Sequence, residues 1–153
     1  MTNFALLQTN IAFNDPEANY AHVRELFAKA MQKTPRPDVV VLPEDWATGF
    51  SDVMFHHMEE LCEPLNGPSV TVCRELAKQY HVWVVAGSIS TRHEDGKMRN
   101  TTFLIDRDGE IVGDYSKMHL YSDMDEDAQL VHGSKSDVFD TELGRLGFMI
   151  CYD

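Results

Sequence analysis

The pattern of hydrophobic and polar positions predicts alternating strands and helices in the first half of the chain. An apolar run over 4–13 suits an opening strand and its exit. The segment 14–17, Asn-Asp-Pro-Glu, then carries the capping side chains, the proline and the first-turn acid typical of a helix start. Apolar residues recur at helical spacing from there to about residue 33. After two prolines, the β-branched run over 38–42 predicts a strand that is covered on both faces.

The second half of the chain adds strands and one further helix, and its turns are marked by glycine. Asp95-Gly96 and Asp108-Gly109 have the chemistry of hairpin turns, because glycine supplies the positive φ that such connections need. The remaining elements expected are a helix over 69–80 and strands over 82–89, 100–105, 110–116, 137–140 and 145–151. The chain is therefore predicted to be a mixed α/β protein with antiparallel additions.

The last expected strand has the composition of a core strand, and the sequence stops directly after it at Asp153. A core strand in that position would expose apolar surface and unpaired backbone groups, so domains seldom end in this way. We therefore expect residues 1–153 to be the N-terminal portion of a single longer domain whose C-terminal part is absent.

Composition narrows the choice of partner and compartment. With 25 Asp and Glu against 13 Lys and Arg, the formal net charge is −12, which argues against nucleic acid or an anionic membrane as a partner because both need a positive surface. No apolar run approaches the roughly 20 residues that span a bilayer, and the N-terminus lacks the basic segment of a signal peptide. Three cysteines, an odd number, favour reduced thiols and a cytoplasmic location.

Three reactive side chains each follow an expected strand. Glu44 comes after the run that ends in Leu-Pro, Lys117 comes after the strand over 110–116, and Cys151 comes after Gly-Phe-Met-Ile. Strand ends are rigid platforms, and open α/β sheets build their sites there. A thiol nucleophile, a carboxylate that takes its proton and an ammonium that stabilises an oxyanion would together support acyl transfer.

The same three places resemble the signature segments of the carbon–nitrogen hydrolase (nitrilase) superfamily. The segments are Leu42-Pro43-Glu44 with Thr48-Gly49-Phe50, then Tyr115-Ser116-Lys117-Met118-His119-Leu120-Tyr121, and finally Gly147-Phe148-Met149-Ile150-Cys151-Tyr152-Asp153. Each motif alone is weak, whereas three in the correct order form a specific signal. The resemblance implies a four-layer α-β-β-α sandwich of the nitrilase type, of which this chain is the N-terminal part.

The resemblance also implies a Glu-Lys-Cys triad. Cys151 would attack the carbonyl carbon of an amide and form a thioester, and Glu44 would act as general base and then as general acid towards the departing ammonia. Lys117 would bind the oxyanion, helped by the backbone N–H of Tyr152. A lysine buried beside carboxylates is expected to stay charged, and a cation near Cys151 is expected to favour its thiolate. No cofactor or metal is implied.

Further positions are assigned by the resemblance alone. Glu126 looks like the second glutamate that many members place beside the lysine, although it lies in an acidic run and such runs are usually solvated faces. Trp46 and Phe50 would lie near the pocket mouth and shape the acyl-group site. His119 resembles a supporting residue of the lysine segment.

The function implied is hydrolysis of the C–N bond of a small carboxamide with release of ammonia. The stretch over 117–127 is most similar to the ω-amidase-like bacterial branch, which acts on carboxamides of dicarboxylic keto acids, and relatives usually form homodimers. Partners would thus be a small-molecule amide and a second copy of the chain.

Two other functions stay open at this stage. One is a truncated, inactive relative that serves as a binding or assembly module, and the other is a Cys-His hydrolase with His119 as its base. Cys62 and Cys73 are interpreted as ordinary buried thiols. The adjacent His56 and His57 are interpreted as a surface pair, because neighbouring histidines on a helix point apart and no ligand lies at zinc-site spacing.

Overall fold

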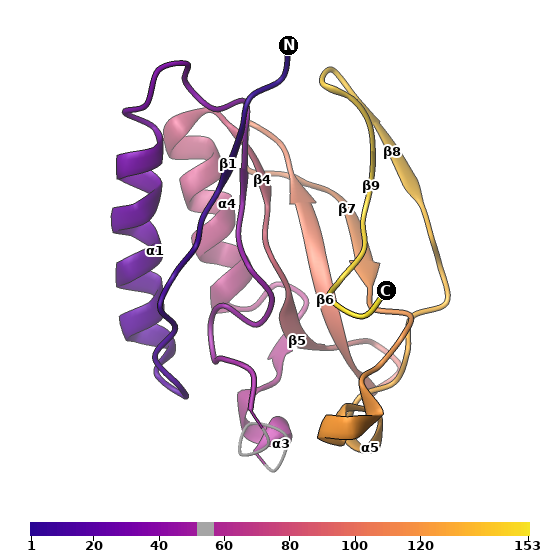
Figure 1. The fold of residues 1–153 in the computed structure, drawn as a ribbon. Helices are drawn as coiled ribbons and strands as arrows, with labels where there is room; N and C mark the ends of the chain where they lie inside the picture. The colour runs from indigo at the N-terminus through magenta and orange to yellow at the C-terminus, as the bar shows by residue number, and fades with distance from the viewer. Residues whose placement is uncertain (52–56) are drawn as a thin grey trace.

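Two helices cover one face of a central sheet, and a hairpin lies over its other face (Figure 1). The computed structural model describes residues 1–51 and 57–153. The helices are α1 (Pro16–Ala30) and α4 (Pro68–Tyr80), and the hairpin is formed by β8 (Val138–Thr141) and β9 (Gly144–Gly147). The described part of the chain thus forms a helix layer, a sheet layer and the beginning of a third layer.

The main sheet of the described residues has seven strands and mixed directions. Its order is β1 (Phe4–Leu6), β2 (Val39–Val41), β4 (Trp83–Val85), β6 (Met98–Ile105), β5 (Ile89–Arg92) and β3 (Glu63–Pro64), with β7 (Ile111–Ser116) on the free edge of β6. β1, β2 and β4 are parallel, while β6 runs antiparallel to β4, β5 and β7. The three parallel strands therefore end at the edge of the sheet where the loop after β2 begins.

The helix layer packs where the sequence pattern predicts it. Asp15 caps α1 by accepting a hydrogen bond from the Ala18 N–H at 3.1 Å, and proline occupies the first turn. The apolar sides of both helices meet the sheet in one core, which removes that apolar surface from water. Its fully buried members include Val23, Phe27, Val40, Val70, Cys73, Ala77, Val82, Val84 and Ile105.

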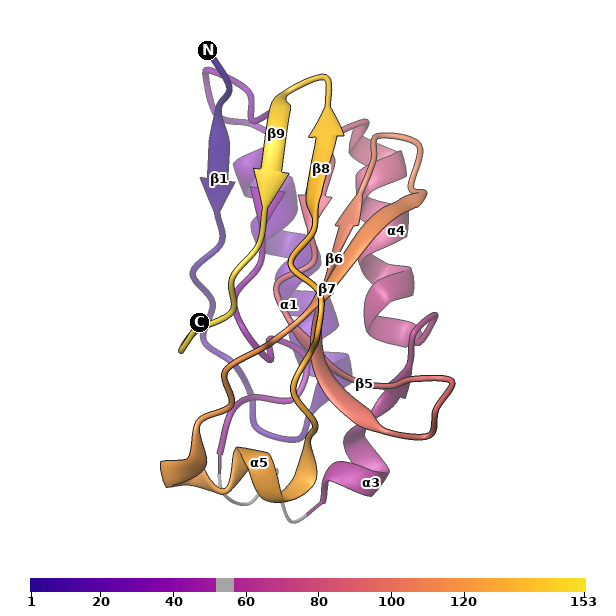
Figure 2. The same ribbon diagram turned by 90° about the vertical axis from the view of Figure 1, so that its right-hand side faces the viewer.

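The β8–β9 hairpin covers the opposite face of the sheet, and Figure 2 views the molecule from the side of this hairpin. Phe139, Leu146 and Phe148 pack against Val39 and Leu104 in a second cluster. Because side chains alternate along a strand, Asn100 and Thr102 lie on the same face of β6 as Leu104. The face of the sheet that the hairpin covers is therefore apolar at Leu104 and polar at Asn100 and Thr102, and the candidate site lies at its polar end.

Short helices at one end of the sheet were not predicted from the sequence. These are α3 (Met58–Leu61), the 3-10 helix η1 (Ser122–Met124) and α5 (Glu126–Gln129), and α3 and α5 both lie at the lower end of the sheet in Figures 1 and 2. Met58, Met98 and Leu130 form a small buried cluster there. Elements of three or four residues are too short for a helical period to show in the sequence.

The strand expected over 82–89 is interrupted. β4 and β5 both pair with the same edge of β6, but three residues between Val85 and Ile89 face two residues between Leu104 and Thr101. This is a β-bulge, and it contains Gly87 with φ +61°. A run of apolar residues predicts burial but not such a break in the ladder.

The last expected strand is also corrected. β9 ends at Gly147 rather than at Cys151, its residues are largely exposed, and within the described residues it pairs with β8 alone. Phe148, Met149 and Ile150 continue without ladder pairing into a turn at Cys151. The apolar composition of residues 145–151 predicted a core strand, but Ile150 is the one residue of this segment that is buried.

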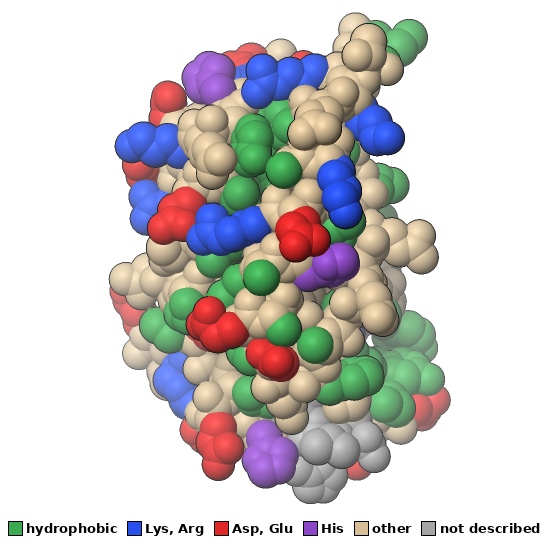
Figure 3. Space-filling model, turned by 90° about the vertical axis from the view of Figure 1, so that its left-hand side faces the viewer, with side chains coloured by type: hydrophobic (Ala, Val, Ile, Leu, Met, Phe, Trp, Pro, Cys, Tyr) green, Lys and Arg blue, Asp and Glu red, His purple; other side chains and the backbone are tan. Residues whose placement is uncertain are grey.

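The surface carries both signs of charge. Figure 3 views the side on which α1 lies in Figure 1 and shows Lys and Arg side chains interspersed with Asp and Glu. One such pair joins the two helices, with Arg24 Nη2 2.6 Å from Glu75 Oε2. Among the helices described, none is long and apolar enough to cross a membrane.

The bulge at Gly87 supplies a test of the fold. A Cβ there would lie 2.0 Å from the Pro43 carbonyl oxygen, so we expect Gly87→Ala to combine backbone strain with a steric clash. Gly96 has a similar φ of +76° with nothing within 4 Å of the added Cβ, so Gly96→Ala is the matched control. Urea unfolding of the full-length protein should show a loss of about 1–2 kcal/mol for Gly96→Ala and at least about 2 kcal/mol more for Gly87→Ala. Equal losses would contradict the close approach.

Candidate active site

Lys117 lies at the end of β7 with its side chain fully buried. Its backbone is held on both sides, because its N–H donates to the Asn100 carbonyl at 2.9 Å and its own carbonyl accepts the Gly133 N–H at 2.7 Å. A Cβ at Gly133 would lie 2.1 Å from the Ser116 carbonyl oxygen, so this position needs glycine. The ammonium group is thereby fixed on the face of the sheet that the hairpin covers.

Glu44 occupies the loop after β2 and reaches the same ammonium. Its Oε1 lies 3.1 Å from Lys117 Nζ and accepts a hydrogen bond from Asn100 Nδ2 at 3.0 Å. The loop is fastened to the bulge, because the Ser88 N–H donates to the Pro43 carbonyl at 3.1 Å. With 23 % of its side chain exposed, Glu44 keeps access to the space beyond the lysine.

Glu126 is the second carboxylate on Lys117. It begins α5, is fully buried, and its two oxygens lie 3.1 and 2.9 Å from Nζ. The Tyr121 N–H donates to Oε2 at 2.7 Å, and Asn100 Nδ2 lies 3.4 Å from Oε1. Glu126 is therefore part of the cluster and lies beside the lysine, where the resemblance implies a second glutamate, although it belongs to an acidic run.

The charges in this cluster keep the lysine protonated. Burial alone would lower the pKa of Lys117, but the hydrogen bond to Glu126 and the negative charges of Glu44 and Glu126 outweigh it and raise the pKa. The sequence-based expectation of a charged lysine is therefore confirmed. One ammonium between two carboxylates leaves a net negative charge at the site.

Cys151 stands on an exposed turn beside this cluster. Its backbone has φ +48°, a conformation that non-glycine residues rarely adopt, and the turn is closed by the Asp153 N–H donating to the Ile150 carbonyl at 3.1 Å. Cys151 and Glu44 line one cavity of about 130 Å³, with Ser88 and Thr102 among its other walls. The structure thus brings the thiol and the carboxylate to a shared space.

The thiol does not favour the thiolate, contrary to the sequence-based expectation. Burial, then the negative charge of Glu44 and a hydrogen bond with it, raise the pKa of Cys151, while Lys117 lowers it by less. At neutral pH the sulfur is therefore protonated and lies next to a carboxylate that can accept its proton.

Asp45 is a member of this region that the sequence analysis missed. It is buried, its N–H donates to Ser88 Oγ at 3.2 Å, and its Oδ1 has no hydrogen-bond partner among the described residues. Burial and the negative charges of Glu44 and Glu126 raise its pKa well above the usual range. The protonated form of Asp45 is therefore favoured relative to that of an exposed aspartate, and its side chain is close enough to Glu44, Glu126 and Lys117 to feel their charges.

The two aromatic residues assigned to the pocket mouth, Trp46 and Phe50, lie in different surroundings. Trp46 is fully buried in the helix-side core, where its Nε1 donates to the Ala86 carbonyl at 2.9 Å, so its assignment to the mouth is wrong. The reason is the backbone of Asp45, whose φ of +44° turns the chain between Glu44 and Trp46. Phe50 does lie near the cluster, with its ring centre 5.9 Å from Lys117 Nζ.

Tyr152 and His119 lie on the surface near the Cys151 turn. Tyr152 is exposed, and its ring centre is 5.6 Å from that of Tyr121. His119 is exposed too, and its Nδ1 is 3.0 Å from Asp153 Oδ1. Because His119 does not line the cavity of Cys151, the structure gives no support to a Cys-His pair.

Cys62, Cys73 and His57 are not among the residues that line the cavity of Cys151. Cys73 is fully buried in the helix-side core, and burial raises the pKa of Cys62 to about 11. His57 is exposed, 3.5 Å from Glu60, while His56 lies outside the described residues. In residues 1–51 and 57–153 there is no group of three His, Cys, Asp or Glu side chains suited to a metal ion.

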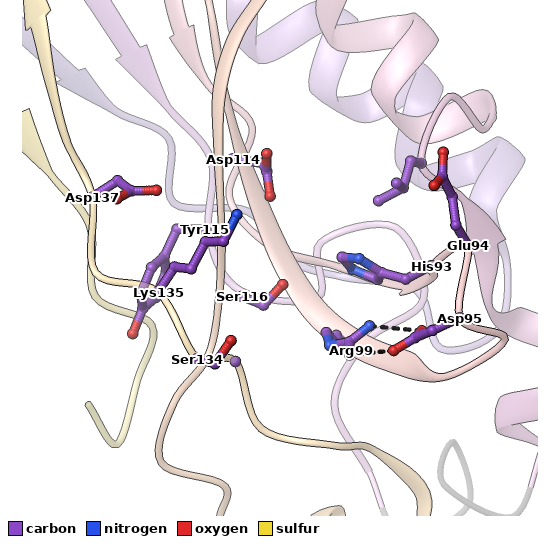
Figure 4. A pocket seen from close by; sticks show the side chains of 12 residues that line it. His93, Glu94, Asp95, Arg99, Asp114, Tyr115, Ser116, Ser134, Lys135 and Asp137 are labelled. Carbon is purple, nitrogen blue, oxygen red and sulfur yellow. Dashed lines mark hydrogen bonds and ion pairs between the residues drawn. The ribbon is translucent and has the colours of Figure 1, made fainter.

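A larger cavity of about 430 Å³ lies beside the edge strand β7 (Figure 4). His93, Asp114, Ser116 and Lys135 are among its lining residues, and Arg99 in its wall is neutralised by two hydrogen bonds to Asp95. Neither Cys151 nor Glu44 lines this cavity. The reactive groups therefore belong to the smaller space.

The buried charge cluster generates a stability test. Lys117→Met leaves the buried Glu126 carboxylate without its cation, and we expect the free energy of unfolding of the full-length protein to fall by about 3–5 kcal/mol. Lys117→Met/Glu126→Gln should recover at least about 1 kcal/mol of that loss, since glutamine still accepts the Tyr121 N–H. Arg24→Met, which breaks an exposed pair, should cost less than about 1 kcal/mol. Urea unfolding measures all three, and equal losses in the single and double Lys117 variants would contradict the charge pairing.

Comparison with known proteins places the chain in a family. The family model described as carbon-nitrogen hydrolase matches residues 3–153. The chain is 32 % identical over 147 residues to the 2-oxoglutaramate amidase of Bacillus subtilis, and this match covers 96 % of the chain and 54 % of that protein. It is 30 % identical over 159 residues to the omega-amidase NIT3 of Saccharomyces cerevisiae. This match covers 97 % of the chain and 54 % of that protein.

Comparison of the fold with solved structures leads to the same family. The crystal structure of Saccharomyces cerevisiae Nit3, a member of branch 10 of the nitrilase superfamily, superimposes with a TM-score of 0.87 at 29 % identity and covers 99 % of this chain and 55 % of that one. The chain therefore spans about half the length of the curated relatives it matches. Because the family model extends over almost every residue and a relative is 32 % identical over 96 % of the chain, the chain belongs to the carbon-nitrogen hydrolase family.

Proposed function

We propose that the protein hydrolyses the C–N bond of a small carboxamide through a cysteine thioester and releases ammonia. The observation that carries this proposal is the shared cavity of Glu44 and Cys151, with Lys117 held 3.1 Å from the same carboxylate. A nucleophile and a base that share one space, with a fixed cation bound to that base, are parts that acyl transfer needs. The names of the amidases that the chain resembles add support.

The first half of the reaction forms the acyl-enzyme. Glu44 takes the thiol proton while Cys151 Sγ bonds to the amide carbon, and the carbonyl π electrons move onto oxygen. Lys117 Nζ and the backbone N–H of Tyr152 stabilise that oxyanion. The intermediate collapses as the C–N bond breaks, and Glu44 returns the proton to the leaving nitrogen, so that ammonia departs and a thioester remains.

The second half regenerates the enzyme. Glu44 takes a proton from water, the resulting hydroxide oxygen bonds to the thioester carbon, and the C–S bond breaks. The sulfur recovers the proton from Glu44, and a carboxylic acid is released. Glu126 takes no part in these transfers, because it is fully buried against Lys117, and its role is to hold Nζ in place.

The substrate class follows from the relatives and from the charges of the site. Monoamides of dicarboxylic acids are the class that the name omega-amidase indicates. Their distal carboxylate requires a cation, and among the described residues that line the Cys151 cavity none is Lys or Arg. A cationic side chain outside those residues is therefore part of the proposal for this substrate class.

Ammonia release tests the proposed reaction. We expect the full-length protein to release ammonia from monoamides of four- and five-carbon dicarboxylic acids faster than from neutral aliphatic amides of equal length. Cys151→Ala and Glu44→Gln should each lower kcat/KM by at least about 10⁴-fold, as loss of a nucleophile or base does in other acyl-transfer enzymes. Cys62→Ala, which removes a thiol without a base, should retain activity. Release of ammonia by Cys151→Ala at the unsubstituted rate would overturn the proposal.

The protonated thiol gives a second, independent prediction. Because the charge of Glu44 raises the pKa of Cys151, Glu44→Gln should lower that pKa and speed alkylation of Cys151 by iodoacetamide at neutral pH. The rate is followed against pH by mass spectrometry of the Cys151 peptide, with the Cys62 peptide as an internal reference because its pKa is about 11. A slower reaction in Glu44→Gln would show that the carboxylate does not act on the thiol in this way.

A further inference from the structure

Asp153 has a hydrogen-bond arrangement that the reaction itself does not use. Its side chain is 3 % exposed, although it lies two residues from the exposed Cys151. Oδ2 accepts the Tyr115 O–H at 2.7 Å and the Ile150 N–H at 2.9 Å; Oδ1 accepts the Met118 N–H at 3.0 Å and the His119 N–H at 2.9 Å, with His119 Nδ1 at 3.0 Å. One carboxylate thus receives donors from two distant parts of the chain.

These donors flank two of the reactive residues. Tyr115 and Met118 lie on either side of Lys117 in the sequence, and Ile150 directly precedes Cys151. The side chain of Asp153 therefore ties the segment that carries the ammonium to the turn that carries the thiol. Hydrogen bonds of ionised groups are shorter and stronger than neutral ones, so a single residue makes a firm connection here.

The Cys151 turn needs such a connection. Its φ of +48° costs a side-chain-bearing residue about 1–2 kcal/mol, and strained positions persist only where their surroundings hold them. Asp153 closes the turn twice, through its own N–H to the Ile150 carbonyl and through Oδ2 to the Ile150 N–H. Ladder pairing does not hold the turn, since β9 ends at Gly147.

The carboxylate is ionised in this setting. Burial would raise the pKa of Asp153, but the hydrogen bonds from Ile150, Tyr115 and His119 together lower it. With both oxygens engaged by donors, the group has no free position for a proton in transit. Its chemistry is that of a fixed acceptor and not of an acid or base.

We infer that Asp153 is a positioning residue, which sets the place of the Cys151 sulfur relative to the Lys117 ammonium and the Glu44 carboxylate. The inference rests on the proposed function, because it assigns Asp153 to the same reaction. It predicts a defect in the chemical step rather than in substrate affinity, since misplacement of reacting atoms by about 1 Å costs on the order of 10²-fold in rate.

Asp153→Asn is the direct test. Asparagine offers one acceptor oxygen, and its amide group would face donors on the other side. In the full-length protein we expect kcat for ammonia release to fall by on the order of 100-fold, with KM changed by less than about threefold. The matched control is Asp106→Asn, because Asp106 Oδ1 also accepts two backbone N–H groups, from Asp108 and Glu110 at 2.9 Å each, in a turn remote from the site. This control should retain kcat.

Alkylation of Cys151 separates positioning from stability. In Asp153→Asn the Cys151 thiol is no longer held beside Glu44, so its pKa should be lower. Cys151 should then react with iodoacetamide at neutral pH at least about fivefold faster in Asp153→Asn than in Asp106→Asn. Thermal unfolding is recorded for each variant, and both rates are measured well below the melting temperature. This readout needs no amidase activity, so a failure of the proposed function and a failure of the present inference are distinguishable.

Tyr115→Phe keeps the inference testable if Asp153→Asn does not fold. It removes one donor to Oδ2 and leaves the four from Ile150, Met118 and His119 in place, so we expect the same two changes at smaller size, about threefold to tenfold in kcat. If either folded variant shows kcat and alkylation rates equal to those of Asp106→Asn, Asp153 has no positioning role and the inference is overturned.

Discussion

The ammonium of Lys117, buried between Glu44 and Glu126, is the interaction on which the rest of the site depends. A lone buried ammonium would lose its proton, and lone buried carboxylates would take one up. The hydrogen bond to Glu126 and the charges of the two carboxylates raise the pKa of Lys117 despite its burial, and Asn100 adds a neutral donor to both carboxylates. The same Glu44 carboxylate that contacts the ammonium also lines the cavity of Cys151, so the cation and the thiol share one neighbour.

The sheet places these groups through an irregularity and not through regular strand ends alone. The bulge at Gly87 lets the Pro43 carbonyl approach the backbone of β4–β5, and this contact fixes the loop that carries Glu44. Beyond it, the positive φ of Asp45 sends Trp46 into the helix-side core. One short loop thus contributes a reactive carboxylate to one face of the sheet and a core aromatic ring to the other.

Sequence reasoning recovered what is encoded locally. Helical spacing and capping residues gave α1 and α4 within a few residues, and strand-end motifs singled out Glu44, Lys117 and Cys151, which the structure brings to one region. Asn100, Asp45 and Asp153 were missed because their roles arise from pairing between distant segments. Asn100 alone left a signal, a polar side chain at the start of the apolar strand expected over 100–105. The extent of the strand over 145–151 was wrong because apolar composition does not reveal which backbone groups find a partner.

The attachment of the Cys151 turn has a mechanical consequence. The turn is joined to the lysine segment by Asp153, and its backbone continues from the β8–β9 hairpin through Phe148 to Ile150, which lie beyond the end of β9. The stretch is instead held by side chains, because the ring centre of Phe148 lies 5.6 Å from that of Phe139 and Ile150 is buried. The spacing of sulfur and ammonium is therefore secured by polar contacts to the lysine segment and by aromatic packing on the hairpin, without a continuous strand between them.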